Sequence, residues 1–319
     1  MRVPFPFRAL MLGVAILGLL IARGNATGVV FVINSTGASI SVIDMETRQE
    51  VRRIPAMREP HHITATPDGK TLLVGDTAGN QILFLDAATG AVLRRMPIAD
   101  PYHLAFSPNG KFLVVNGLAR GQVDIYDAET MTLIRRFPVV SMPSHLDFSP
   151  DSRTVFVSLQ GSGNLAAFDL VAMTPLWTEP VGATPAGVLW HQGKVLVANM
   201  GADYVAAVDP ATGKVVDKIV TGNGAHNMFL SPDGKILWVN NRASGSTVSL
   251  NAATLTVLRT YPIAGGPDDI AFAPGGKLWI TRRFAGKVAV LDPSSGAYET
   301  IVVGRSPHGL WVNPEAPSP

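Results

Sequence analysis

The chain repeats one short pattern seven times. Each copy opens with a proline or an alanine, continues with two variable residues and an alternating apolar stretch, and usually ends in Ser-Pro-Asp-Gly-Lys or a relative of it. The copies begin at Pro60, Pro101, Pro143, Pro185, Ala225, Pro267 and Pro307. Their spacing of 40–42 residues is typical of the four-stranded blades of a β-propeller.

The interior of each copy predicts strands. After Lys70, for example, the runs TLLVGD, QILFLD and AVLRRMP are separated by TAGN and AATG. Short runs rich in Val, Ile, Leu and Phe, bounded by Gly, Asn and Asp, are typical of strands joined by tight turns. With the run that opens the copy, each unit has four strands, so we expect an all-β fold with four antiparallel strands per blade.

The two ends of the chain hold complementary pieces of one unit. Residues 29–56 match its last three strands, and residues 307–313 match its first strand. Pairing of these N- and C-terminal strands would complete a seventh blade, close the ring and cover the sheet edges. We therefore expect one seven-bladed propeller over residues 27–313, followed by a flexible tail at 314–319.

Residues 1–26 read as a secretory signal peptide. Arg2 and Arg8 supply the positive region, Ala9–Ala22 is the apolar stretch, and Gly24 and Ala26 are small residues suited to cleavage before Thr27. The apolar stretch is short for a membrane span. We expect a periplasmic or secreted protein without stable membrane insertion after cleavage, although retention of the segment as an anchor is the alternative.

Composition narrows the range of partners. Loss of residues 1–26 moves the formal net charge from +2 to −1, and the remaining charges are scattered along the repeats. A nucleic-acid binder needs a basic patch, so none is expected here. The chain has no cysteine, which excludes disulfides, thiolate metal sites and covalent haem attachment through CxxCH. We expect the partner to be a small molecule or another periplasmic protein.

The predicted second strands carry a recognisable signature. They include LVVNG at 113–117, LVANM at 196–200 and LWVNN at 237–241, and Pro-His-Gly follows at 307–309. With the Ser-Pro-Asp-Gly-Lys turns, these segments resemble the YVTN-repeat family of seven-bladed propellers over residues 29–313. The resemblance implies an exported bacterial protein, distantly like the haem-binding propellers of nitrite reductases. Residues 278–296 also resemble blades of the virginiamycin B lyase group, over about one blade.

Histidines mark one phase of the repeat. The two variable positions hold six of the seven histidines in the chain: His61, His62, His103, His145, His226 and His308. These positions open the innermost strand of each blade, so their side chains should line one mouth of the central channel. The first ring of positions is His61, Tyr102, Ser144, Ala186, His226, Asp268 and His308. The second ring is His62, His103, His145, Gly187, Asn227, Asp269 and Gly309.

A transition metal is one candidate occupant of this mouth. Neutral imidazoles that converge from several strands suit zinc, copper, iron or nickel. We expect His62, His103 and His145, from three successive blades, to converge as metal ligands, with Asp269 or His226 completing the set from across the ring. The alternative is a structural rim, in which the histidines form hydrogen bonds from blade to blade.

Arginines indicate a second kind of ligand. Turns after the second strands carry Arg242, Arg282 and Arg283 and should flank the same mouth. Arginine beside polar groups suits a carboxylate or a phosphate. The candidate ligand-binding set is therefore His61, Tyr102, His226, His308, Arg242, Arg282 and Arg283.

Three functions stay open at this stage. The first is an exported binding or accessory module with its ligand at the histidine-rimmed channel mouth. The second is an oxidoreductase that depends on a transition metal or haem, or an accessory to one. The third is a lyase or lactonase-like enzyme that uses a divalent cation. The sequence predicts no specific catalytic residue.

Overall fold

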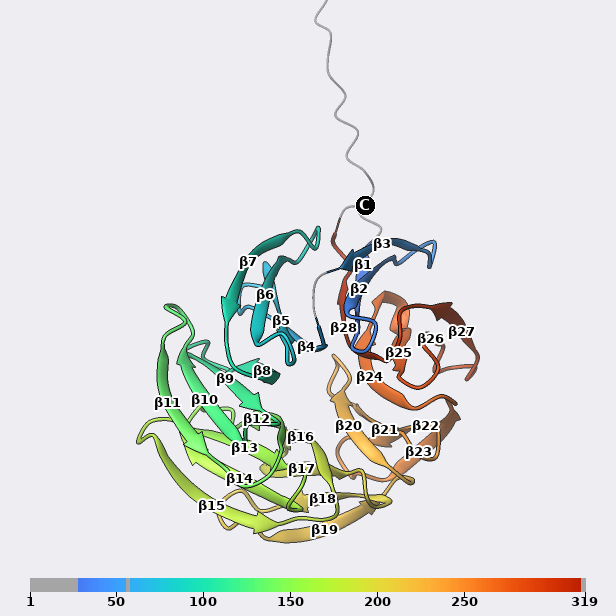
Figure 1. Ribbon diagram of the computed structural model, residues 1–319. Helices are drawn as coiled ribbons and strands as arrows, with labels where there is room; N and C mark the ends of the chain where they lie inside the picture. Colours follow the sequence, from blue (N-terminus) through green and yellow to red (C-terminus); the bar gives the residue numbers. More distant parts are fainter. Residues whose placement is uncertain (1–27, 56–57, 317–319) are drawn as a thin grey trace, which may run out of the picture.

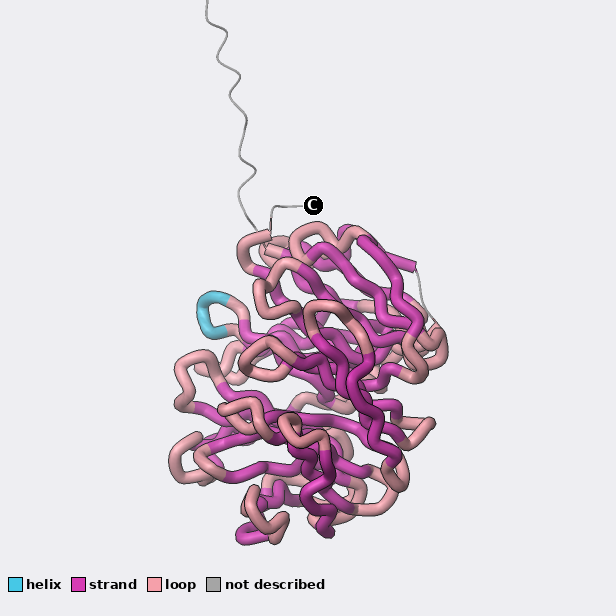
Figure 2. The backbone as a smooth tube through the Cα atoms, turned by 90° about the vertical axis from the view of Figure 1, so that its left-hand side faces the viewer, coloured by secondary structure: helices cyan, strands magenta, loops and turns pink. Residues whose placement is uncertain are grey.

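The expected architecture is confirmed. The computed structural model describes residues 28–55 and 58–316, and these residues form seven four-stranded antiparallel sheets around a central axis (Figure 1). Figure 2 shows the strands from the side, with loops at both faces of the ring. The 3₁₀ turn η1 (Pro274–Gly276) is the single helical segment of the described residues. The expected signal peptide at 1–26 lies outside them.

Each blade is listed here from its innermost to its outermost strand. The blade built from both chain ends contains β28 (Pro307–Asn313), β1 (Val29–Asn34), β2 (Ser39–Asp44) and β3 (Glu50–Pro55). The second blade contains β4 (Pro60–Ala65), β5 (Thr71–Asp76), β6 (Gln81–Asp86) and β7 (Val92–Pro97). The third contains β8 (Pro101–Phe106), β9 (Phe112–Gly117), β10 (Gln122–Asp127) and β11 (Leu133–Pro138). The fourth contains β12 (Pro143–Phe148), β13 (Thr154–Leu159), β14 (Asn164–Asp169) and β15 (Thr174–Pro180). The fifth contains β16 (Pro185–His191), β17 (Lys194–Asn199), β18 (Tyr204–Val208) and β19 (Val215–Val220). The sixth contains β20 (Ala225–Leu230), β21 (Ile236–Asn241), β22 (Ser246–Asn251) and β23 (Val257–Pro262). The seventh contains β24 (Pro267–Phe272), β25 (Leu278–Arg282), β26 (Lys287–Leu291) and β27 (Tyr298–Val302).

The ring closes between the two ends of the chain, as expected. Strand β28 pairs antiparallel with β1, with Leu310 opposite Val32 and Val312 opposite Val30. The described part of the expected tail continues along the same blade, where the amide of Gly28 donates a hydrogen bond to the carbonyl of Ala316 at 3.1 Å. Closure covers the inner edge of β1, which would otherwise be open to pairing with another chain.

The apolar core lies between neighbouring blades. One cluster joins Phe31 and Ile33 of β1 to Leu72 and Val74 of β5 in the adjacent blade. The middle strands are buried on both faces, whereas an outermost strand such as β7 is largely exposed. Burial of apolar surface holds the blades together, and it leaves the innermost strands to supply the polar side chains around the axis. None of the described residues forms a helix long and apolar enough to span a bilayer.

The first prediction concerns closure. Deleting residues 305–319 removes β28 and exposes the edge of β1, so the truncated chain should lose its single cooperative thermal transition and aggregate. Leu310→Ala should destabilise the closed ring by about 2–5 kcal/mol, because it leaves a cavity in a buried cluster. Calorimetry and size-exclusion chromatography measure both, with a deletion of only 317–319 as the control. A 305–319 deletion that melts like the full chain would show that this pairing is dispensable.

Candidate functional site

Every innermost strand has a register break near its beginning. In β4, Pro60 pairs with Asp76 and Ile63 with Val74, so His61 and His62 lie opposite one residue, Gly75. The other six blades break register at the same place in their innermost strands. A bulge sets two residues against one and changes the direction of their side chains. Consecutive residues of the first and second rings can therefore both reach the axis, instead of alternating between opposite faces of the blade.

The six rim histidines come together in the channel. His62 lies at the centre of the group, with ring centroids 4.4 Å from His308, 4.5 Å from His103 and 4.8 Å from His145. His61 contacts His308 at 4.0 Å and Tyr102 at 4.1 Å. His226 lies 5.3 Å from His145. The structure thus brings His62, His103 and His145 together, as the sequence pattern predicts, and adds His61 and His308 to the same group.

Asp269 lies at one side of this group. It is half-buried and lines the same cavity as His62 and His103. Burial, together with the charge of Asp268, raises the pKa of Asp269 to about 8. Its carboxyl group is therefore mostly protonated at neutral pH, which makes it a hydrogen-bond donor rather than a ready metal ligand.

Asp268 is the central charged residue of the site. It is not among the candidate site residues predicted from the sequence. Its side chain is fully buried. One carboxylate oxygen accepts hydrogen bonds from Arg242, whose Nε lies at 3.0 Å, and lies 2.8 Å from His226 Nδ1. The other lies 3.4 Å from Arg283 Nη1 and 3.7 Å from His308 Nε2. The sequence feature that could have identified Asp268 is its position in the first ring, at the same phase of the repeat as the histidines.

The charges around Asp268 outweigh its burial. Burial alone would raise the pKa of Asp268, but Arg242, His226 and Arg283 hold it well below its usual value. Asp268 is therefore ionised, and it anchors the guanidinium groups of Arg242 and Arg283 over the axis. Arg282 takes a different direction, because its Nε donates to the carbonyl of Ala264 at 2.6 Å and its Nη1 to Thr300 Oγ1 at 3.1 Å. The structure does not bring Arg282 to the mouth.

The hydrogen bonds between blades mostly avoid the imidazoles. A polar side chain of one second strand donates to the backbone carbonyl of a first-ring residue in the next blade: Asn116 to Ser144 at 2.8 Å, Ser158 to Ala186 at 2.6 Å and Thr281 to His308 at 2.7 Å. Two rim histidines also make polar contacts with other blades: His226 through Asp268, and His308 through Nε2, which lies 3.4 Å from Arg242 Nη2. Among the imidazoles of His61, His62, His103 and His145, no hydrogen bond between blades is found within the described residues, so the carbonyls of the first ring carry most of this structural role.

Five imidazoles keep a buried nitrogen without a hydrogen-bond partner among the described residues. These atoms are His61 Nδ1, His62 Nε2, His103 Nδ1, His145 Nε2 and His308 Nδ1. Burial lowers the pKa of all six rim histidines, to about 3 for His103. The rings are therefore neutral at neutral pH. A neutral imidazole has one nitrogen with a free lone pair, which can accept a proton or bind a metal.

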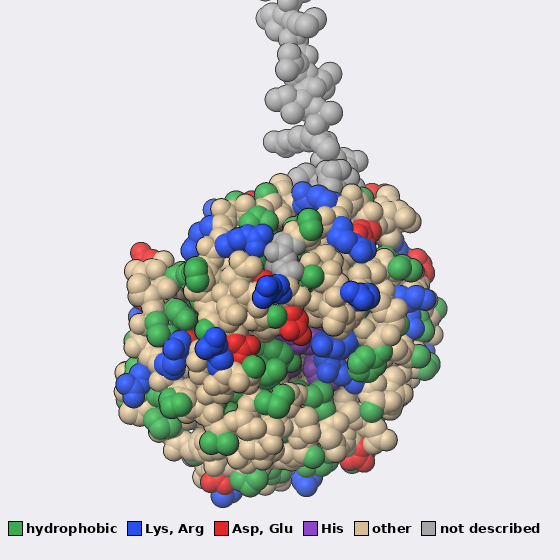
Figure 3. Space-filling view, in the orientation of Figure 1, with side chains coloured by type: hydrophobic (Ala, Val, Ile, Leu, Met, Phe, Trp, Pro, Cys, Tyr) green, Lys and Arg blue, Asp and Glu red, His purple; other side chains and the backbone are tan. Residues whose placement is uncertain are grey.

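Two cavities adjoin the histidines at opposite ends of the innermost strands. The mouth cavity, of about 620 Å³, lies where these strands begin and is lined by His61, Tyr102, Thr77, Asn80, Glu59, Asp100, Arg120 and Arg283, among others. Figure 3 shows histidine at the base of a central hollow, with acidic and basic side chains around it. The second cavity, of about 600 Å³, lies further along the strands and is mostly apolar, with Phe229, Phe272 and Trp311 in its wall.

Haem does not fit between the facing imidazoles. Two axial imidazoles bind haem iron edge-on from opposite faces of the macrocycle, so their rings must stand well apart on either side of it. The ring centroids of His61 and His308 are 4.0 Å apart. Beside the histidines, the two cavities lined by described residues leave room for a larger molecule.

Comparison with known proteins confirms the family. The YNCE-like beta-propeller family matches residues 14–318. The chain belongs to this family. The sequence matches no curated protein.

Solved structures share the fold of this family member at low identity. The "Kuenenia stuttgartiensis Hydrazine Synthase" is 22% identical with a TM-score of 0.68, over 78% of this chain and 88% of the other. The dihydro-heme d1 dehydrogenase NirN in complex with DHE is 15% identical with a TM-score of 0.67, over 92% and 78%. The Pseudomonas aeruginosa periplasmic gluconolactonase PpgL is 19% identical with a TM-score of 0.71, over 89% and 98%. At these identities the likeness establishes the fold alone.

The second prediction concerns pH. In the unfolded chain the rim histidines take up protons below their ordinary pKa of about 6.5, whereas in the folded chain they stay neutral to far lower pH, about 3 for His103. Stability should therefore fall as the pH drops below about 6.5, by up to about 1.4 kcal/mol per pH unit for each such histidine. Asp269, whose folded pKa is about 8, opposes one histidine over this range and makes stability decline slightly as the pH rises from 7 to 8. Thermal melts between pH 8 and pH 5 measure this, and His103→Gln should reduce the slope. A melting temperature that rises as the pH drops from 6.5 to 5 would contradict the neutral, buried state of the histidines.

The third prediction concerns Asp268. Asp268→Asn keeps the shape of the side chain but leaves Arg242 and Arg283 without their counter-charge, so it should destabilise the fold by about 3–5 kcal/mol. Glu179→Gln is the matched control, because it breaks the exposed pair between Glu179 and Lys214 at 2.6 Å, and exposed pairs contribute little. Chemical denaturation of the three proteins compares them. Equal effects of the two changes would show that Asp268 does not organise the site.

Proposed function

We propose that this protein is an exported binding module that holds a small, carboxylate-bearing polar molecule in the mouth cavity. The observation that carries the proposal is the guanidinium of Arg283, which lines a cavity of about 620 Å³ above the neutral histidines. Ligand cavities for small molecules commonly have volumes of about 300–1,000 Å³. The proposal that the protein is exported is supported by residues 1–26, which resemble a signal peptide. The proposal that it acts as an accessory module is supported by the cavity, whose lining suits the binding of a ligand.

Arg283 is the cation best placed for a ligand carboxylate. Arg242 already directs its Nε and Nη2 at Asp268, whereas Arg283 reaches the same carboxylate through Nη1 alone, at 3.4 Å. The side chain of Arg283 is 20% exposed, on the cavity side of a fully buried partner. A guanidinium fixed at one corner offers its remaining N–H groups to a carboxylate, often in paired hydrogen bonds.

The rest of the cavity wall suits hydroxyl groups. Thr77, Asn80 and Tyr102 can donate or accept hydrogen bonds, and Glu59 adds a carboxylate acceptor. With Arg120 and Asp100, the acidic and basic groups of the lining balance, which disfavours a strongly charged ligand. A sugar acid of the gluconate type has one carboxylate and several hydroxyls that match this wall. One similar solved structure is named a periplasmic gluconolactonase.

A specific observation favours lactone hydrolysis as a second candidate function. His61 lines the mouth cavity, is neutral and keeps Nδ1 without a partner among the described residues. An imidazole in that state can accept the proton of a water molecule that attacks a bound ester carbonyl. Arg283 would then stabilise the negative charge that develops on the carbonyl oxygen.

The fourth prediction tests the binding function. Isothermal titration with gluconate, 6-phosphogluconate and citrate, in the presence of EDTA, should reveal a 1:1 complex with at least one of them. Arg283→Gln should weaken it at least tenfold, which is about 1.4 kcal/mol. Arg282→Gln is the matched control, since the neighbouring arginine points away from the mouth, and it should bind like the parent protein.

Two outcomes would overturn this proposal. Absence of binding for every carboxylate and phosphate ligand would remove its basis, and so would equal effects of Arg282→Gln and Arg283→Gln. Gluconolactone is tested in the same buffer by following acid release. Turnover that is lost in His61→Gln while gluconate still binds would establish the hydrolytic function instead.

A further inference from the structure

We propose that His61, His62 and His308 bind one divalent transition-metal ion, of the zinc, copper or nickel kind, inside the channel. This site lies below the mouth cavity and goes beyond the carboxylate site proposed above. It shares His61 with the wall of that cavity, but it rests on the geometry of the three imidazoles and does not depend on carboxylate binding.

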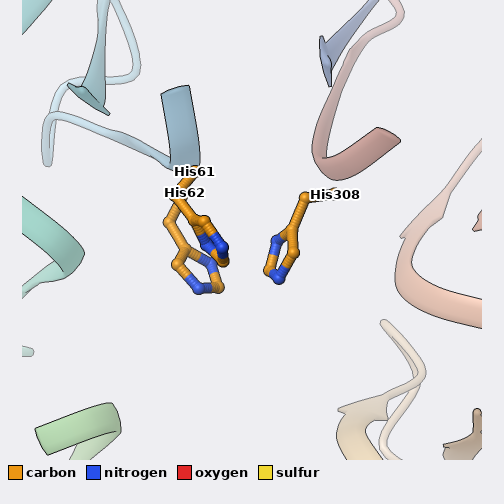
Figure 4. Close-up of side chains that lie close together, drawn as sticks. All are labelled: His61, His62 and His308. Carbon is orange, nitrogen blue, oxygen red and sulfur yellow. The ribbon is translucent and has the colours of Figure 1, made fainter. Parts of the chain in front are cut away.

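The three imidazoles already form a compact group. One ring nitrogen of each lies within 4.8 Å of the others. The ring centroids are 4.0 Å apart for His61 and His308, 4.4 Å for His62 and His308, and 5.0 Å for His61 and His62. Figure 4 shows the rings of His61 and His62 on one side and that of His308 on the other, with nitrogen atoms facing the gap between them.

Each of these imidazoles has a buried nitrogen available for a metal. His61, His62 and His308 are 4%, 5% and 1% exposed. His61 Nδ1, His62 Nε2 and His308 Nδ1 have no hydrogen-bond partner among the described residues. A buried polar atom without a partner costs free energy, and coordination through these three nitrogens would satisfy all of them at once. Neutral imidazole nitrogen is a preferred ligand of zinc, copper and nickel.

Small rotations of the rings would complete the geometry. Zinc bonds to imidazole nitrogen at about 2.0–2.1 Å, which places ligand nitrogens roughly 3–3.5 Å apart. The ring nitrogens lie within 4.8 Å of one another, so modest turns of the rings are enough to reach this spacing. Three protein ligands leave a coordination position for water or another ligand, as in catalytic zinc sites. Because His61 also lines the mouth cavity, that position can face the mouth.

The surroundings of Asp268 favour a metal at His61, His62 and His308 over a metal at the second possible set of ligands. His226, Asp268 and His308 are a second possible set, but the carboxylate of Asp268 is already paired with two guanidinium groups, which repel a cation. Asp268 Oδ2 lies 3.7 Å from His308 Nε2, and Arg242 Nη2 lies 3.4 Å from the same nitrogen. Binding of a metal at His308 Nδ1 would therefore require Nε2 to carry its proton and to turn toward Asp268 instead of Arg242. Metal-bound histidines usually direct their other N–H at a carboxylate or carbonyl, which fixes the ring and its tautomer.

The metal would also tie the ring together at its closure. His308 comes from β28, the last strand of the chain, whereas His61 and His62 come from β4 in the adjacent blade. A ligand that binds only the folded chain raises its stability. Metal binding should therefore raise the melting temperature, which gives a readout separate from any activity.

The experiment uses the mature full chain, stripped with EDTA and desalted, and no organic ligand. Titration with Zn²⁺ by calorimetry, and with Co²⁺ by visible absorption, should give one ion per chain with a Kd of about 1 µM or tighter. His61→Gln and His308→Gln should each weaken binding by at least about tenfold and remove the metal-dependent rise in melting temperature. His103→Gln is the matched control, because His103 belongs to the same cluster and contacts His62, yet lies outside the trio.

Three results would overturn the site. They are absence of stoichiometric binding to the parent protein, an effect of His103→Gln as large as that of His308→Gln, and X-ray absorption of the zinc-loaded parent showing fewer than three imidazole ligands. The absorption measurement needs no variant, so it decides the matter even where a substituted chain fails to fold. Metal binding without carboxylate binding, or the reverse, separates this site from the function of the mouth cavity.

Discussion

A bulge near the start of each innermost strand governs this propeller. It sets two consecutive residues against one on the neighbouring strand, so both can reach the axis. Without it, strand alternation would send every second residue to the other face of the blade. The channel therefore receives side chains from two rings of positions, and its density of imidazoles follows from this backbone feature. Several carbonyls of the first ring accept hydrogen bonds from side chains of the preceding blade. Most of the imidazoles are therefore not needed for hydrogen bonding between blades.

Charge in the channel is concentrated at one residue. Asp268 is ionised and fully buried, and it is compensated by Arg242 from the preceding blade and by Arg283 from its own blade. The imidazoles around it remain neutral, because burial disfavours their charged form. The result is a polar mouth with a fixed guanidinium and a deeper group of uncharged nitrogens. We propose that the first binds an anionic group of a ligand and that the second binds a metal ion.

Ring closure and site formation are linked. Strand β28 pairs with β1 to complete the last blade and also supplies His308 to the axis. His61 and His62 come from the next blade, so the trio exists only when the ring is closed. The chain ends thus contribute both to the stability of the ring and to the chemistry of its centre, while the family match and the similar structures account for the fold alone.

The sequence by itself determined the blade number, the closure and the ring positions of the histidines, because each follows from a period of 40–42 residues and from strand patterns along the chain. It also predicted that His62, His103 and His145 meet, since one repeat phase places them on neighbouring strands. Only the tertiary structure decided that Asp268 organises the site, that Arg283 faces the mouth while Arg282 turns away, and that His61 and His308 join His62. These outcomes depend on contacts across the axis and on the direction in which each bulge aims its side chains, and neither is encoded in the spacing of residues along a single blade.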